Sequence, residues 1–82
     1  MVKRIEVGIL SKADEMFRKL NFIKSYDEGY KATHYKLRYF EDEFVFYEIT
    51  ENIGINTDSI NMEELQAINE KVKELRLDRR RR

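Results

Sequence analysis

The sequence contains no cysteine, no proline and no tryptophan among its 82 residues. The absence of cysteine excludes disulfides, thiol nucleophiles and thiolate metal sites, and it suits a reducing cytoplasm. No apolar run approaches the roughly 18 residues that a membrane-spanning helix needs, so no membrane partner is expected. The basic start MVKRIEVGIL has a short apolar part that Glu6 interrupts, which is not typical of a secretory signal peptide.

Patterns that carry catalysis are also scarce. The chain has a single histidine, His34, with no motif around it, and its 3 glycines are isolated instead of forming a phosphate-binding loop. No serine has the context of a nucleophile elbow. The acidic cluster Glu41-Asp42-Glu43 is more simply a solvated hairpin tip than a calcium loop, which spaces its oxygen ligands through a longer turn. We therefore expect no enzymatic activity, no catalytic residue, no metal site and no cofactor.

Charge is balanced overall but unevenly distributed. The 16 basic residues offset the 16 acidic ones, so the net charge is zero and gives no reason to expect nucleic-acid binding. From residue 41 to residue 70, however, there are 9 acids and no base, whereas residues 71–82 hold 7 bases. This segregation leaves two electrostatic alternatives open: an acidic surface that imitates DNA, and a basic C-terminal tail that contacts nucleic acid.

Two segments have helical patterns. In LSKADEMFRKL, Ser11 is the candidate N-cap with Asp14 as its capping-box partner, and Asn21 can end the helix in the left-handed conformation. In SINMEELQAINEKVKEL, Asn61 and Glu64 form the same kind of start. Each helix has one apolar face, formed by Ala13, Met16, Phe17 and Leu20 in the first and by Leu65, Ile68, Val72 and Leu75 in the second.

The middle of the chain has β patterns. The segments FIKSY, THYKLRYF and EFVFYEIT predict three strands, and ENIGINTD predicts a short edge strand. Within the first ten residues, Ile5, Val7 and Ile9 favour a further strand, although a helix stays an alternative there. The expected fold is α+β: an antiparallel sheet of three to four strands with a central aromatic hairpin, one helix from the N-terminal half and one C-terminal helix packed on it. We expect a single domain over residues 1–77 and a basic C-terminal tail over residues 78–82.

The central hairpin provides a candidate core face. If Glu41-Asp42 is a two-residue loop, Tyr39 opposes Phe44 across the hairpin. A slip of one residue would exchange the two faces of the hairpin, so this assignment depends on the loop. The face expected to meet the core comprises Tyr35, Leu37, Tyr39, Phe44 and Phe46.

The second face of the hairpin combines cations, aromatic rings and aliphatic groups. It is either a solvated sheet face covered by long basic side chains or a partner-binding face. In the assumed register, Lys36 or Arg38 lies beside Tyr47 in a cation–π contact. The candidate partner-binding residues are His34, Lys36, Arg38, Phe40, Val45 and Tyr47. The candidate acidic surface comprises Glu41, Asp42, Glu43, Glu48 and Glu51.

Two segments, ADEMFRKLNF at residues 13–22 and MEELQAINEKVKEL at residues 62–75, resemble small proteins of phages and prophages of Gram-positive bacteria. Those proteins begin with a pattern like A-D-x-M-F-x-x-L-G-[FY] and end with T-M-x-E-L-x-A-I-x-x-K-x-x-E-L-G. The matched positions are helix caps and helix cores, so no functional residue carries over. Asn21 and Arg76 stand where family members often have glycine. Asn21 can replace it, whereas Arg76 suggests that the last helix continues towards Asp78.

The resemblance implies a phage-encoded accessory protein in the cytoplasm of a bacterial host. Small phage proteins without catalytic residues commonly bind a host protein, including components of host defence or replication. We therefore expect a non-enzymatic protein that binds a host protein. Single-stranded nucleic-acid binding through the aromatic-basic face and the arginine tail stays an alternative, as does inhibition by an acidic surface that imitates DNA. A homodimer that buries the second hairpin face is also open.

Overall fold

The chain folds into one antiparallel sheet with two helices on it. The computed structural model describes the backbone of residues 11–80 and the side chains of residues 11–76. The described elements are α1 (Lys12–Lys19), β1 (Phe22–Asp27), β2 (Ala32–Leu37), β3 (Glu43–Tyr47), β4 (Asn52–Asn56) and α2 (Met62–Arg80). The strand expected in the first ten residues lies outside the described part of the chain.

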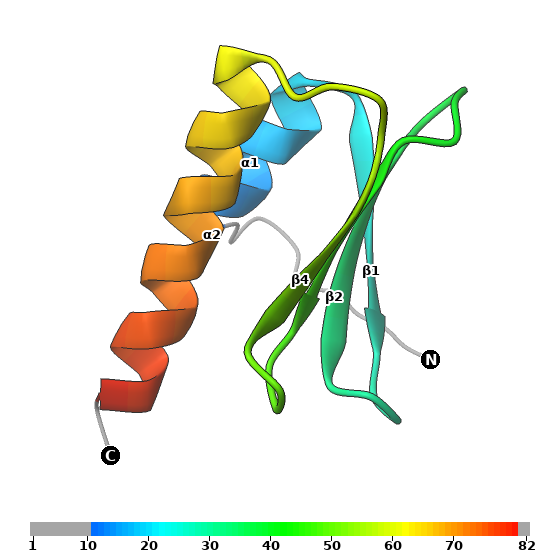
Figure 1. Ribbon diagram of the computed structural model, residues 1–82. Helices are drawn as coiled ribbons and strands as arrows, with labels where there is room; N and C mark the ends of the chain where they lie inside the picture. The colour runs from blue at the N-terminus through cyan, green and yellow to red at the C-terminus, as the bar shows by residue number, and fades with distance from the viewer. Residues whose placement is uncertain (1–10, 81–82) are drawn as a thin grey trace.

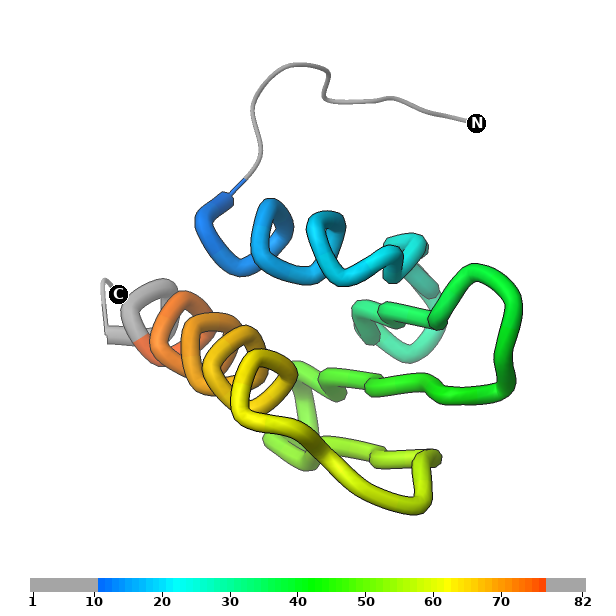
Figure 2. Tube along the Cα trace, turned by 90° about the horizontal axis from the view of Figure 1, so that it is seen from above, coloured from blue at the N-terminus to red at the C-terminus, as the bar shows by residue number. Residues whose placement is uncertain are grey.

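The layers confirm the predicted α+β class. The strands follow the order β1-β2-β3-β4, so every neighbour in the sheet is also a neighbour in the chain. Both helices lie side by side on one face of the sheet, as Figure 1 and Figure 2 show. The opposite face is covered by no described helix, and the aromatic hairpin β2–β3 occupies the middle of the sheet.

The helix boundaries follow the predicted capping residues. The Ser11 hydroxyl oxygen accepts a hydrogen bond from the Asp14 backbone N–H at 3.0 Å, and Asn21 closes α1 with a φ of 74°. At the start of α2, the Glu64 N–H donates to the Asn61 side chain at 2.8 Å, and the Asn61 N–H donates to the Glu64 carboxylate at 3.2 Å. This reciprocal pair is the predicted capping box.

The core is aromatic and lies between the sheet and the helices. The Phe17 ring of α1 stacks on the Tyr35 ring of β2, with ring centroids 4.0 Å apart and planes within 12°. Phe22 meets the edge of Phe17 at 5.6 Å, and the Lys71 ammonium lies 5.9 Å from the Tyr35 ring centroid. The buried cluster comprises Phe17, Phe22, Tyr35, Phe44, Phe46, Ala67 and Ile68, with Met16, Leu20, Leu37, Val72 and Leu75 partly buried against it. The predicted helix faces are thus confirmed, except that Leu65 is 42% exposed.

The predicted hairpin register is wrong, but the predicted faces are nearly right. Phe44 pairs with Tyr35 instead of Tyr39, which is a shift of four residues. An even shift keeps every side chain on its own face. Tyr35, Leu37, Phe44 and Phe46 therefore face the core as expected, whereas Tyr39 is 81% exposed in the loop.

A longer loop explains the shift. The hairpin closes where the Leu37 N–H donates to the Asp42 carbonyl at 2.9 Å, so residues 38–41 form the loop instead of Glu41-Asp42 alone. Contacts from distant residues hold this loop, since the Arg38 N–H donates to the Asn21 carbonyl and the Thr57 hydroxyl donates to the Asp42 carboxylate. A turn rule that uses only the residues of the loop cannot predict contacts with such distant partners.

Helix α2 continues past Arg76 to Arg80. The extension agrees with the expectation that a helix without a glycine stop at Arg76 runs towards Asp78. Residues 78–80, which the sequence assigned to a tail, are therefore helical in their backbone. Leu75 is the last residue of α2 that packs against the described core.

Candidate partner-binding face

The sheet side that faces away from both helices is called the open face below. Because successive side chains of a strand point to opposite faces and directly paired residues share a face, the core residues and the strand register together identify the open-face residues. Phe22, Tyr35 and Phe44 meet the helices, so their strand neighbours point the other way. The open face comprises Ile23, Ser25, Asp27, Ala32, His34, Lys36, Glu43, Val45, Tyr47, Asn52, Gly54 and Asn56.

Four of the six candidate partner-binding residues share this face: His34, Lys36, Val45 and Tyr47. Arg38 and Phe40 lie in the β2–β3 loop, which projects on the side away from the helices (Figure 1). The loop adjoins the open face because two open-face side chains bind its carbonyls. The Lys36 ammonium donates to the Phe40 carbonyl at 3.0 Å, and the Asn56 amide donates to the Glu41 carbonyl at 3.3 Å.

The prediction of a cation–π contact between Tyr47 and Lys36 or Arg38 is wrong. Lys36 opposes Glu43 across the hairpin, whereas Tyr47 opposes Ala32. Lys36 and Ala32 are four residues apart on β2, a separation of about 13 Å in a strand. Arg38 lies beyond Lys36, at the other end of β3 from Tyr47. The register shift therefore separates the cations from the ring that they were expected to cover.

The centre of the open face is a polar pair beside an apolar residue. The His34 Nδ1 atom lies 2.9 Å from the Glu43 carboxylate, and both side chains are 28% exposed. His34 also pairs with Val45, which is buried at 8% exposure. The glutamate holds the imidazole in one orientation on this face. At its β1 side, Ile23 adds an aliphatic group that is 47% exposed.

The candidate acidic residues do not form one surface. Glu41, Asp42 and Glu43 lie at the β2–β3 end of the sheet, whereas Glu48 and Glu51 lie at the β3–β4 end. The five residues of β3 separate the two groups by about 17 Å. The run of acids in the sequence is thus divided between opposite ends of a strand.

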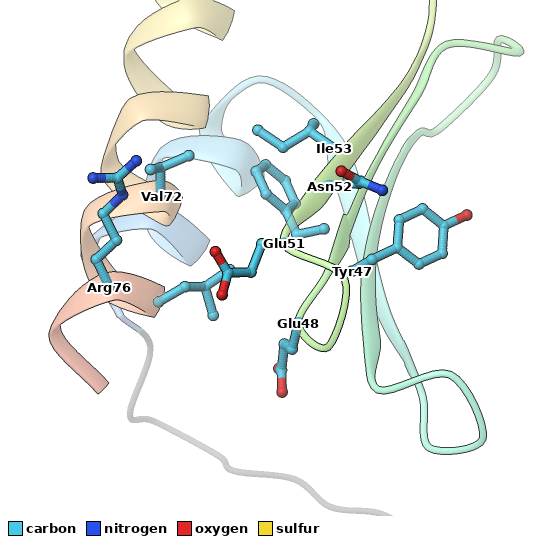
Figure 3. A pocket seen from close by; sticks show the side chains of 9 residues that line it. Tyr47, Glu48, Glu51, Asn52, Ile53, Val72 and Arg76 are labelled. Carbon is cyan, nitrogen blue, oxygen red and sulfur yellow. The ribbon is translucent and has the colours of Figure 1, made fainter. Parts of the chain in front are cut away.

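A pocket of about 230 Å³ opens between the second half of α2 and the β3–β4 turn (Figure 3). Figure 3 shows Val72 and Arg76 of α2 across from Glu51 and Ile53. Its lining residues are Phe46, Tyr47, Glu48, Glu51, Asn52, Ile53, Val72, Leu75 and Arg76. This volume is below the roughly 300–1,000 Å³ typical of small-molecule sites, and the lining lacks histidine, serine and cysteine. The pocket is therefore a small apolar recess with charged walls.

A buried carboxylate connects α1 to the sheet. Asp14 is 8% exposed; one carboxylate oxygen accepts from the Tyr35 hydroxyl at 2.6 Å and the other from the Lys24 ammonium at 2.8 Å. Burial alone would raise the pKa of Asp14, but the hydrogen bonds and the charges of Lys24 and Lys71 outweigh burial and hold this pKa below its usual 3.8. Both oxygens are engaged, so Asp14 is a structural anion and not a free base.

The carboxylate of Asp14 also raises the pKa of Tyr35. Burial is the largest cause, followed by the hydrogen bond to Asp14 and the negative charges of Asp14 and Glu74. The phenol therefore stays protonated well above its usual 10 and keeps donating to the carboxylate. The sequence offered one signal for this role, since Asp14 falls beside Ala13 and three residues before Phe17 on the apolar face of the helix.

The described residues contain neither a candidate metal cluster nor a candidate membrane-spanning helix. Among the side chains of residues 11–76, no group of three or more His, Cys, Asp or Glu residues could hold a metal ion. Neither α1 nor α2, the helices in the described part of the chain, is long and apolar enough to cross a membrane.

Comparisons with known proteins add no relative. No protein-family model matches the chain, and neither a curated protein nor a solved structure matches it. The likeness to small phage proteins consequently stays a hypothesis.

Proposed function

We propose that this chain is a small non-enzymatic protein that binds a folded protein partner through its open face and the adjoining β2–β3 loop. One observation carries the proposal: Ile23 on the open face is 47% exposed, and Tyr39 and Phe40 in the adjoining loop are 81% and 62% exposed. Large apolar side chains among charged neighbours are typical of protein interfaces. The polar pair of His34 and Glu43 on the open face would supply directional contacts to the partner.

The proposed setting follows from the resemblance to small phage and prophage proteins. In that setting the partner is a host protein in the bacterial cytoplasm, and the chain acts as an accessory factor that modifies or inhibits it. Components of host defence or of replication are the partner classes that such accessory proteins commonly address.

The two alternatives have weaker support. A single-stranded nucleic acid needs aromatic rings that are free to stack next to cations. Tyr47, however, is partly buried, and a Cβ on Gly54 would lie only 3.5 Å from its ring. Lys36 lies about 13 Å away along the neighbouring strand. An acidic surface that imitates DNA needs a continuous row of carboxylates, and Glu43 and Glu48 lie at opposite ends of β3.

The proposal is tested by affinity capture from a nuclease-treated lysate of a Gram-positive host, with three versions of the chain side by side. These are the natural chain, Phe40→Ser in the β2–β3 loop, and the matched control Met62→Ser. Met62 is 70% exposed at the start of α2, so both substitutions remove a large exposed apolar group. We expect one protein to be retained by the natural chain and the control and lost with Phe40→Ser.

Three results would contradict the proposal. The first is a catch that disappears with nuclease, which would indicate nucleic acid. The second is a catch retained equally by all three versions, which would place the interface elsewhere. The third is the absence of any captured protein.

A further inference from the structure

Strand β4 is an edge of the sheet without the usual protection. It pairs with β3 alone, so the hydrogen-bonding groups on its outer side have no partner strand among the described elements. Soluble proteins commonly protect such edges with lysine, proline or a bulge. The segment Asn52–Asn56 contains no charged residue and no proline. The opposite edge, β1, differs because its Lys24 binds Asp14 of α1.

The sequence of β4 reads the same in both directions, Asn-Ile-Gly-Ile-Asn, with Gly54 at its centre. We propose that β4 pairs antiparallel with β4 of a second copy of this chain, with Gly54 opposite Gly54 on a twofold axis. Such an interface is isologous, because the same patch of each copy meets itself. In this register the symmetric sequence sets like residues opposite each other, isoleucine against isoleucine and asparagine against asparagine.

The side chains across this axis are complementary. Ile53 of one copy lies opposite Ile55 of the other, and these residues are 39% and 51% exposed in the single chain. Both point to the helix side, since they pair with Phe46 and Phe44, and Ile53 lines the pocket beside Val72 and Leu75. Pairing would therefore remove apolar surface from water. Asn52 lies opposite Asn56 on the open face, where amide groups can donate and accept across the axis.

No charge opposes this pairing within the strand. The segment Asn52–Asn56 has no charged residue, so no like charges meet across the axis.

Neither helix lies across the outer edge of β4, because both stand on one face of the sheet (Figure 2). The pair would form one sheet of eight strands, twice the four of a single chain, with all helices on one side. The two open faces would then join into one continuous surface. The inference does not depend on the proposed function, because it concerns the edge of the sheet and not its open face.

Crosslinking tests the twofold axis directly, since the chain has no cysteine of its own. A Cβ at Gly54 would lie 3.5 Å from Tyr47 and 3.7 Å from Val45, ordinary contact distances, so Gly54→Cys fits the folded chain. Directly opposed residues of antiparallel strands have Cα atoms about 4.5–5.5 Å apart, which suits a disulfide. We expect mild oxidation to link Gly54→Cys into a dimer, while Ser25→Cys on β1 stays single.

A second pair of variants tests the energetics by light scattering over a concentration series. The natural chain should reach twice its monomer mass of 10.0 kDa. Gly54→Lys places two like charges against each other and should raise the dimer dissociation constant by about tenfold or more. The matched control Gly54→Ala fills the same space without charge and should remain dimeric. Circular dichroism of all four variants verifies that each one is folded.

Each of the opposite results overturns the proposal. A natural chain that keeps a mass of 10.0 kDa at every concentration would assign the β4 edge to another chain or to solvent. Crosslinking of Ser25→Cys at the rate of Gly54→Cys would indicate a dimer through the open face. Equal dimerisation of Gly54→Lys and Gly54→Ala would place the axis away from Gly54.

Discussion

At the scale of single residues, the most informative side chain is Asp14. It was expected to support the start of α1, and its backbone N–H does bind Ser11. Its carboxylate, however, points into the domain and binds Tyr35 and Lys24 on two different strands. One acidic group thus holds a short helix in place over the sheet, which an eight-residue helix needs because it is too short to be stable alone.

Removal of this carboxylate should destabilise the domain more than removal of its neighbour. Asp14→Ala leaves the buried Tyr35 hydroxyl without an acceptor and Lys24 without its anion, so we expect a loss of about 2–3 kcal/mol in the free energy of unfolding. Glu15→Ala, on the exposed side of α1, should change it by less than about 0.5 kcal/mol. Urea titrations of the two variants measure both values. Equal losses would show that the buried contacts add no stability.

The lowered pKa of Asp14 predicts a dependence of stability on pH. A carboxyl whose pKa is lower in the folded chain contributes stability that is complete above its unfolded pKa and is lost as pH falls through its folded pKa. The stability difference between the natural chain and Asp14→Asn should therefore be constant above about pH 5 and should shrink below about pH 4. Thermal melts between these limits and pH 2 measure it. A difference that stays constant down to pH 2 would contradict the depressed pKa.

At the scale of elements, local sequence signals predicted the helix ends correctly, whereas turn rules did not predict the pairing of the strands. The caps at Ser11, Asn21 and Asn61 were predicted correctly because each depends on residues within one turn. The register of β2 and β3 was not, because the loop between them is fixed by Asn21 and Thr57 from other parts of the chain. The assignment of residues to the two hairpin faces stayed correct only because the register shift was an even number of residues.

The end of α2 allows a test of where the domain stops contributing to stability. Among the side chains that the structure describes, Leu75 is the last core contact of this helix, so a chain shortened to end at Leu77 should lose less than about 0.5 kcal/mol. Leu75→Ala in the full chain should cost about 1–2 kcal/mol, less than the loss at a fully buried leucine, because this side chain is only partly buried. Chemical denaturation compares the two. Unfolding of the shortened chain would show that residues 78–82 belong to the folded domain.

At the scale of the whole molecule, the open face could be predicted only in part, because the sequence indicated the pairing of β2 with β3 but not the positions of β1 and β4 beside them. His34, Lys36, Val45 and Tyr47 could be assigned to one face from two strands alone. Ile23 on β1 and the asparagines of β4 could be assigned to the same face only from the order of the strands in the sheet. The run of acids in the sequence likewise did not indicate that they lie at opposite ends of β3. Residues that are close in the sequence can be far apart in the fold.

The same topology predicts that the helices and the sheet unfold together. The Phe17 ring of α1 contacts Phe22, Tyr35, Phe44 and Phe46, so a single side chain connects one helix with three strands. Phe17→Leu should lower the free energy of unfolding by about 1–3 kcal/mol, whereas Phe40→Leu in the exposed loop should change it by less than about 0.5 kcal/mol. In both variants, far-ultraviolet dichroism, which reports the helices, and tyrosine fluorescence should follow one common transition. Separate transitions in Phe17→Leu would mean that the sheet holds its structure without α1, and that the aromatic cluster is not the shared core of the domain.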